Sequence, residues 1–129
     1  MNQDQAEAFK WFLAAARMGH AGAQYKVGAA YAFGEGTERD PGKAQAWYEK
    51  AAAQGFAMAQ RNLGSMYMNG EGVQQNKPLA LAWYNILAAG GNVMDIRRRD
   101  MLMQELSESE VAEAQHLAEN LKAGITAAH

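Results

Sequence analysis

The chain has 129 residues, no cysteine and a formal net charge of −2, which is enough for one domain with its own core. Without cysteine there is no disulfide, no thiolate metal site and no cysteine nucleophile. The slightly acidic balance argues against a nucleic-acid binder that works by neutralising phosphates. Apolar residues make up 49% and charged residues 20% of the chain, as in a folded globular protein rather than a disordered one.

No run of apolar residues reaches the roughly 18 that predict a membrane span, and the N-terminal residues do not form a signal peptide. A secreted protein in its mature form has the same appearance. The sequence therefore leaves the compartment open: cytoplasmic or, if a signal peptide was removed, periplasmic or secreted.

The chain contains an internal repeat. Trp11, Trp47 and Trp83 are evenly spaced, since 47−11 and 83−47 both equal 36. The same offset relates Ala8, Ala44 and Ala80, then Ala16, Ala52 and Ala88, and finally Gly19, Gly55 and Gly91. A fixed period of this length is typical of solenoids built from pairs of helices. We therefore expect an all-α protein, a single α-solenoid.

The first predicted helix, 5–18, carries Trp11 and recurs as 41–54 and 77–89. Asp4, Asp40 and Asn76 precede these three segments, and Asp and Asn are favoured N-caps because their side chains accept bonds from first-turn N–H groups. A glycine follows each segment, where it permits a left-handed helix end.

Shorter helices are predicted between them, at 21–33 and 57–69. Both contain a glycine at the same repeat position, Gly28 and Gly64, followed three residues later by Tyr31 and Tyr67. Glycine inside a helix costs about 1 kcal/mol relative to alanine. Its recurrence predicts that a neighbouring helix approaches closely there.

The repeat decays in the next helix, 94–106. Its period places alanine, glycine and tyrosine where the chain has Asp95, Asp100 and Met103. Because a carboxylate in a tight contact is costly, we expect this helix to lie at an edge or to shift its register. Ser107 and Glu110 then form a capping box that opens a last amphipathic helix, 108–123.

The repeated pattern, A-x-x-x-[LV]-G-x-x-Y-x-x-G-x-G and then K-A-x-x-W-Y-x-x-A-A-x-x-G, resembles the Sel-1-like repeat, a relative of the tetratricopeptide repeat. It is carried by Ala23, Val27, Gly28, Tyr31, Gly34, Gly36, Lys43, Ala44, Trp47, Tyr48, Ala51, Ala52 and Gly55, and again 36 residues later with small changes. The resemblance implies a right-handed superhelix of antiparallel helix pairs that binds other proteins and has no enzymatic activity. It divides the single domain 1–129 into a partial repeat at 4–20, full repeats at 21–56 and 57–92, and capping helices at 93–129.

The candidate binding residues are those that vary between copies. If the register follows the tetratricopeptide repeat, the concave groove presents Tyr25, Met58, Arg61, Met68 and Arg97. Methionine, arginine and tyrosine are common at protein interfaces, although methionine also fills gaps in cores. Two arginines in one row favour a partner that presents carboxylates.

The leading hypothesis is thus a non-catalytic adaptor that holds a protein or peptide in its groove. The alternative is an immunity-type inhibitor that neutralises a partner enzyme through a broad surface. A remote alternative is an enzyme or a metal protein. Asp95 and Asp100 have no companion for acid–base work, and His20, His116 and His129 have no metal-site spacing. We expect no catalytic residue, metal or cofactor.

A second surface is predicted on the first helix. Phe9 and Leu13 stand where the second copy has Gln45 and Glu49. We expect this apolar pair to be exposed and then covered by a second subunit, by an upstream segment or by the bound partner.

Overall fold

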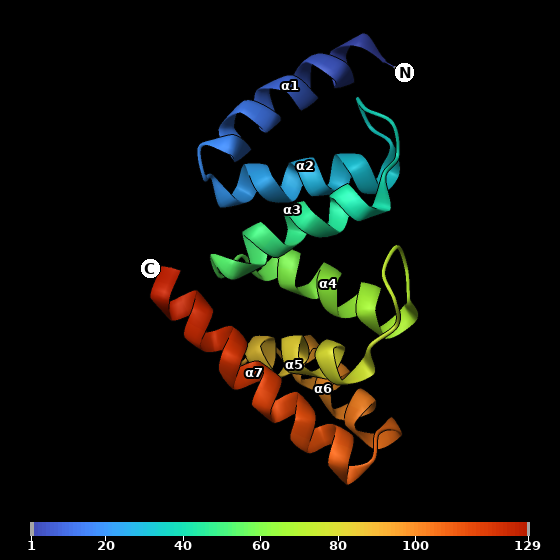
Figure 1. The fold of residues 1–129 in the computed structure, drawn as a ribbon, viewed down its shortest axis with the longest axis vertical. Helices are drawn as coiled ribbons and strands as arrows, with labels where there is room; N and C mark the ends of the chain where they lie inside the picture. The colour runs from blue at the N-terminus through green and yellow to red at the C-terminus, as the bar shows by residue number, and fades with distance from the viewer. Residues whose placement is uncertain (1, 129) are drawn as a thin grey trace.

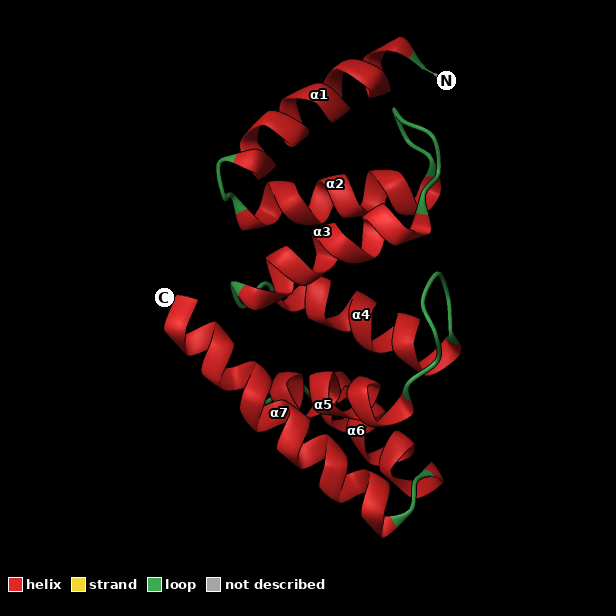
Figure 2. Ribbon diagram, in the orientation of Figure 1, coloured by secondary structure: helices red, strands yellow, loops and turns green. Residues whose placement is uncertain are grey.

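The structure is a computed structural model that describes residues 2–128, and this part of the chain forms seven helices and no strand (Figures 1 and 2). The helices are α1 (Gln3–Arg17), α2 (Ala21–Phe33), α3 (Pro41–Ala53), α4 (Ala57–Asn69), α5 (Lys77–Ala88), α6 (Val93–Glu105) and α7 (Glu108–Ala128). The predicted all-α solenoid is confirmed. Within residues 2–128, none of the helices combines the length and hydropathy of a membrane span.

The N-caps of α3 and α5 lie where the sequence predicts them. The Asp40 carboxylate accepts a hydrogen bond from the Lys43 backbone N–H at 3.1 Å. The Asn76 side chain accepts one from the Leu79 N–H, also at 3.1 Å. Each bond satisfies a first-turn donor that the helix itself leaves unpaired.

The N-cap predicted for α1 is wrong. Asn2 caps this helix rather than Asp4, and its side chain accepts bonds from the N–H groups of Asp4 at 2.7 Å and Gln5 at 3.3 Å. Asn and Asp are comparable caps, so the helix can start at the earlier of the two. Asp4 then lies in the first turn, where a negative charge interacts favourably with the helix dipole.

α2 and α4 each pack closely against the helix that follows, α3 and α5 respectively. A Cβ built on Gly28 would lie 2.7 Å from the Tyr48 ring, and one built on Gly64 would lie 2.6 Å from the Tyr84 ring. Both tyrosines are 2% exposed, so their rings have little room to move. The repeated glycines therefore set the distance between α2 and α3 and between α4 and α5, as the sequence predicts.

Consecutive repeats are joined by bonds that recur at the same period. The buried Gln24 side chain donates to the Ala16 carbonyl and Gln60 donates to the Ala52 carbonyl, each at 3.2 Å. The loops that follow α2 and α4 reach back toward α1 and α3, respectively (Figure 1). In the second of these loops, a Cβ on Gly72 would lie 2.6 Å from the Pro41 side chain.

The last two helices depart from the alternating pattern. α6 packs on α5, but α7 also packs on α5 and reaches α3, instead of pairing with α6 as α3 pairs with α2. Figure 1 shows α7 crossing back along the stack. Asp100 of α6 occupies the repeat position of Gly28 and Gly64, and it is exposed. In the described part of the chain, no tyrosine-bearing helix packs over α6 at this position, so a glycine is not needed there. α6 thus lies at an edge, which was one of the two expectations.

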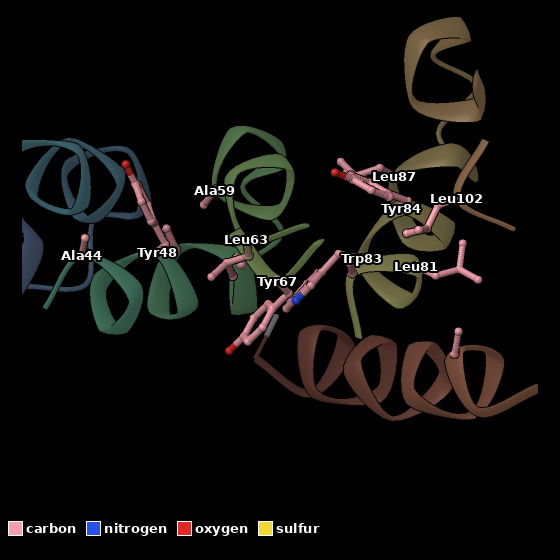
Figure 3. Packing of buried hydrophobic residues seen from close by; sticks show 14 residues of the cluster. Ala44, Tyr48, Ala59, Leu63, Tyr67, Leu81, Trp83, Tyr84, Leu87 and Leu102 are labelled. Atoms are coloured by element: carbon pink, nitrogen blue, oxygen red, sulfur yellow. The ribbon is translucent and has the colours of Figure 1, made fainter. Parts of the chain in front are cut away.

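The core follows this arrangement. Its main cluster runs through α3, α4 and α5 to Leu102 of α6 and Ala114 of α7 (Figure 3). Tyr48, Leu63 and Leu81 are among its largest fully buried side chains. A smaller cluster joins α1 to α2.

Candidate functional site

Two hollows lie along the row formed by α2, α4 and α6. The first, of about 330 Å³, is lined by Ala32, Phe33, Arg39, Pro41, Ala44, Tyr48, Asn62, Ser65, Met66, Glu71 and Gly72. The second, of about 550 Å³, is lined by Arg61, Asn62, Ser65, Met68, Tyr84, Arg98, Met101, Leu102 and Glu105. We call them the first and the second hollow.

The two hollows are successive copies of one feature. Tyr48 in the first corresponds to Tyr84 in the second, since 84−48 equals 36, and the same offset takes Asn62 to Arg98 and Ser65 to Met101. Asn62 and Ser65 also line both hollows. The hollows therefore adjoin along α4 and form one groove.

A buried tyrosine belongs to each hollow. Burial raises the pKa of Tyr48, against the effect of a hydrogen bond with Asn62, and burial also raises the pKa of Tyr84. Removal from water disfavours the phenolate. Both hydroxyls therefore stay neutral at physiological pH, and the groove gains no negative charge from them.

The second hollow contains an ion-pair cluster made of Arg61, Asp95 and Arg98. The Asp95 carboxylate is 1% exposed and accepts two bonds from Arg61, from Nε at 2.8 Å and from Nη2 at 2.7 Å. Arg98 Nη1 donates a third bond to Oδ1 at 3.0 Å. The hydrogen bond from Arg61 holds the pKa of Asp95 below its ordinary value, so this carboxylate is ionised and unsuited to a general-acid role.

Asp95 stays in the register of the repeat. It occupies the position of Ala59, which is fully buried one repeat earlier. The expected penalty for a carboxylate there is offset by two guanidiniums rather than avoided by a shift. The sequence contained a signal for this cluster. Arg98 lies one helical turn after Asp95, and Arg61 lies 34 residues before it, close to one repeat period.

The structure brings together only part of the predicted contact set. Arg61 and Met68 line the second hollow. Met58 and Arg97 are exposed but line neither hollow. Tyr25 is half-buried, with its ring centroid 5.4 Å from that of Phe56 and 5.7 Å from that of Tyr48.

Sequence reasoning missed Asn62 and Arg98 in the groove. They occupy the repeat position directly after Arg61 and Arg97, and that position also varies between copies, with Lys26 in the first. The variation was the available signal. The assumed tetratricopeptide register included the position of Arg61 but not the next one, which also lines the hollows.

The prediction that Phe9 and Leu13 are exposed is wrong. Both are partly buried against α2, and the Phe9 ring meets Tyr31 edge-on with centroids 5.3 Å apart. On the adjoining face of α1, Trp11 is 77% exposed and Phe12 is 40% exposed. The apolar face of α1 left uncovered is therefore the one that carries Trp11 and Phe12.

The two histidines that the structure describes do not form a metal site. His20 Nδ1 accepts a hydrogen bond from the Ala23 N–H at 3.0 Å and so caps α2. His116 is exposed on α7, and His129 lies outside the described residues. Among residues 2–128, no group of three or more His, Asp or Glu side chains is arranged to hold a metal ion.

The stacked helix pairs, their recurring bonds and the groove define a helical-repeat solenoid. The profile of the Sel1 repeat matches residues 1–20, 21–56 and 57–92. The chain belongs to the Sel1 repeat family, whose members are generally protein-interaction modules and typically lack catalytic activity.

Two solved bacterial proteins are similar to this chain. A protective antigen of uropathogenic Escherichia coli with an SLR fold matches 97% of the chain at 28% identity, with a TM-score of 0.89. A Sel1 repeat protein from Oxalobacter formigenes matches 74% at 34% identity, with a TM-score of 0.70. The matches span 27% and 40% of those proteins. No curated protein matches the chain.

Proposed function

We propose that this chain is a non-catalytic protein-binding module that holds an extended segment of a partner protein in the groove. The observation that carries the proposal is the recurrence of one hollow at the repeat period, with Asn62 and Ser65 shared between the copies. A groove that repeats along a row of helices suits a polypeptide segment, whose own side chains recur along its length. The Sel1 family membership supports the same class of partner.

The contact residues we propose are centred on α4. Arg61 and Met68 remain from the set predicted by the sequence, and Asn62, Ser65 and Met101 join them because they line the hollows. Methionine side chains adapt to different partners, whereas arginine supplies fixed donors. A longer partner would also reach the exposed Met58 and Arg97 and the ring of Tyr25.

The test is capture of the partner with a variant that fills the groove. Ser65 lies between the two hollows and is half-buried on α4, so Ser65→Arg places a long side chain across both. The matched control is Ala46→Arg on an exposed position of α3 that lines neither hollow. We expect Ser65→Arg to abolish recovery of the partner from the native cell and Ala46→Arg to preserve it, with helical circular dichroism unchanged in both.

The opposite result would contradict the proposal that the partner binds in the groove. If Ser65→Arg retains the partner while substitutions on exposed positions of α3 and α7 release it, binding uses a broad surface. That outcome would favour the inhibitor of a partner enzyme instead. A partner that is chemically converted by the purified chain would overturn the non-catalytic assignment.

We also propose that the chain forms a homodimer through α1. The contact we propose uses Trp11 and Phe12 in place of Phe9 and Leu13, which already pack against α2. Glu7 and Lys10 flank Trp11 at a shallow depression of this helix. Opposite charges on one face suit a twofold contact in which Glu7 of each copy meets Lys10 of the other.

A further inference from the structure

We infer that the second hollow recognises an acidic side chain, Asp or Glu, within the partner segment, next to an apolar side chain. This inference rests on the proposed groove function and names the chemistry of its partner. It comes from the Arg61–Asp95–Arg98 cluster, which has two positive charges and one negative charge.

The cluster leaves one positive charge without a counter-charge of its own. Asp95 is the buried member at 1% exposure, whereas the side chains of Arg61 and Arg98 are 32% and 43% exposed. The other carboxylate that lines the hollow, Glu105, lies 4.0 Å from the Lys77 ammonium. The second hollow therefore attracts an anion at its guanidinium end.

Both arginines also keep hydrogen-bond donors for a ligand. A guanidinium has five N–H donors, and the bonds to Asp95 involve Nε and Nη2 of Arg61 and Nη1 of Arg98. Asp95 fixes both side chains before any partner arrives. A partner carboxylate thus meets oriented donors without the usual cost of ordering two long side chains.

The rest of the wall is apolar. Met68, Met101 and Leu102 line the hollow together with the buried Tyr84, and Met101 is 64% exposed. An apolar side chain of the partner would lie against the methionines while the carboxylate bonds the guanidiniums. The groove continues past Asn62 and Ser65 into the first hollow, so we assign the carboxylate to a side chain within the segment rather than to a chain terminus.

The first hollow does not share this preference. The position of Arg98 is occupied there by Asn62, and the position of Arg61 by Tyr25, which packs on Phe56. We therefore expect the second hollow, and not the first, to bind the acidic residue of the partner segment.

The experiment selects binders from a random peptide library displayed with its C-terminus fused, so that no peptide has a free terminal carboxylate. Selected sequences are then made as C-terminally amidated, fluorescent peptides, and their Kd is measured by anisotropy. We expect Asp or Glu at one position beside an apolar residue. Replacing it with Asn or Gln should weaken binding about tenfold, the loss of one charge-assisted hydrogen bond.

The protein side of the test uses Arg98→Met, which removes the excess charge and leaves the Arg61–Asp95 pair. It should weaken the acidic peptide about tenfold and leave the amide peptide unchanged, whereas Arg98→Lys should lose less. The matched control is Arg99→Met on the same helix, where Arg99 pairs with Asp100 outside this hollow. If Arg98→Met does not fold, the change of acid to amide in the peptide still decides the question.

The outcomes separate this inference from the proposed function. If no peptide is selected, or if Ser65→Arg leaves binding intact, the groove function itself fails. Peptides that Ser65→Arg releases but that carry no acidic residue would overturn only the inference. An affinity that appears only when a free terminal carboxylate is restored would also overturn it, because the carboxylate would then come from a chain end.

Discussion

At the scale of single residues, the spacing of the helices depends on glycines that face buried tyrosine rings. Gly64 lies against Tyr84, and the ring has no exposed edge toward which to move. A methyl group at this position must displace the ring of a tyrosine that is 2% exposed. Intrinsic helix propensity, which favours alanine over glycine by about 1 kcal/mol, is then outweighed by packing.

We predict that Gly64→Ala lowers the free energy of unfolding by about 1–2 kcal/mol, the cost of overpacking less the gain in propensity. Gly124→Ala is the matched control, because a Cβ there meets nothing within 4 Å on α7. It should be neutral or stabilise by up to about 1 kcal/mol. Urea unfolding measures both, and equal effects of the two substitutions would contradict the role given to Tyr84.

The Asp95 cluster predicts a specific dependence on pH. Its folded-state pKa lies below the ordinary value of 3.8 because Arg61 donates to the carboxylate. A lowered folded pKa contributes stability above the unfolded pKa, and that contribution is lost as the pH falls through the folded value. We expect Asp95→Asn to cost about 1–3 kcal/mol at neutral pH, less than a fully buried pair because both arginines are partly exposed.

The difference in unfolding free energy between the wild-type chain and Asp95→Asn should stay constant above about pH 5 and shrink below about pH 4. Asp100→Asn serves as the control, since that carboxylate is 54% exposed in its pair with Arg99 and should contribute little. A difference that does not change between pH 3 and pH 7, both readily reached in denaturation experiments, would show that the charge of Asp95 does not stabilise the fold.

At the scale of helices, the interface between consecutive repeats is polar in one copy and apolar in the other. Between α3 and α4, the Tyr67 hydroxyl donates to Glu49 at 2.8 Å and accepts from Gln45 at 2.9 Å. One repeat earlier, between α1 and α2, Phe9 occupies the position of Gln45 and packs against the Tyr31 ring. The contact between Phe9 and Tyr31 is thus the apolar equivalent of the hydrogen-bonded contact between Gln45 and Tyr67.

This difference predicts that Tyr67→Phe costs about 1–2 kcal/mol, because it removes two hydrogen bonds from a partly buried hydroxyl, one of them to a carboxylate. Tyr31→Phe should cost less than about 0.5 kcal/mol, because Tyr31 is held through its ring. Burial, together with the Glu49 bond, raises the pKa of Tyr67 from 10.0 to about 12. A raised folded pKa gives stability that is complete below pH 10 and is lost as the pH rises toward 12.

The cost of Tyr67→Phe should accordingly fade over that interval when unfolding is followed as a function of pH. A cost that persists unchanged at the upper end would place the stabilisation in packing rather than in the hydroxyl. Equal costs for Tyr67→Phe and Tyr31→Phe at neutral pH would contradict the distinction between the two interfaces.

The bounds of the helices could be predicted from the sequence where glycines flank both ends. α2 and α4 begin and end at the predicted residues. α7 was predicted as an amphipathic cap, but the helix on which it packs depends on contacts far apart in the chain. The groove shows the same limit: the period placed Arg61 and Met68 on one row, but the pairing of Arg61 with Asp95 depends on the geometry between two helices.

At the scale of the whole molecule, α1 differs from α3 and α5, the equivalent helices of the next two repeats, in what covers it. Ala44 and Tyr48 of α3 are buried beneath α2, and the equivalent residues of α1 are Ala8 and Phe12. Both are exposed, and Trp11 is 77% exposed where Trp83 is 5% exposed. The stack therefore presents at this end the kind of surface that it buries between its own repeats.

We predict that the chain dimerises through this face, since each large apolar side chain removed from water contributes about 1.5–3 kcal/mol before the entropic cost of docking. Light scattering as a function of concentration measures the association. Trp11→Gln with Phe12→Ser should give a monomer that is as stable as the wild-type monomer. Phe9→Gln with Leu13→Glu, which alters the contact with α2, should instead lower stability without abolishing the dimer.

A third variant tests whether a helix of the same chain can cover this face in place of a second copy. Joining a copy of residues 21–40 ahead of Gln5 restores the repeat register, since 41−5 equals 36, and places a glycine opposite Phe12 as Gly28 lies opposite Tyr48. This chain should be monomeric, with Trp11 fluorescence shifted toward that of a buried indole. If the wild-type chain is itself monomeric at high concentration, the dimer is wrong, and a gain in stability of the extended chain would then show that this face accepts a helix.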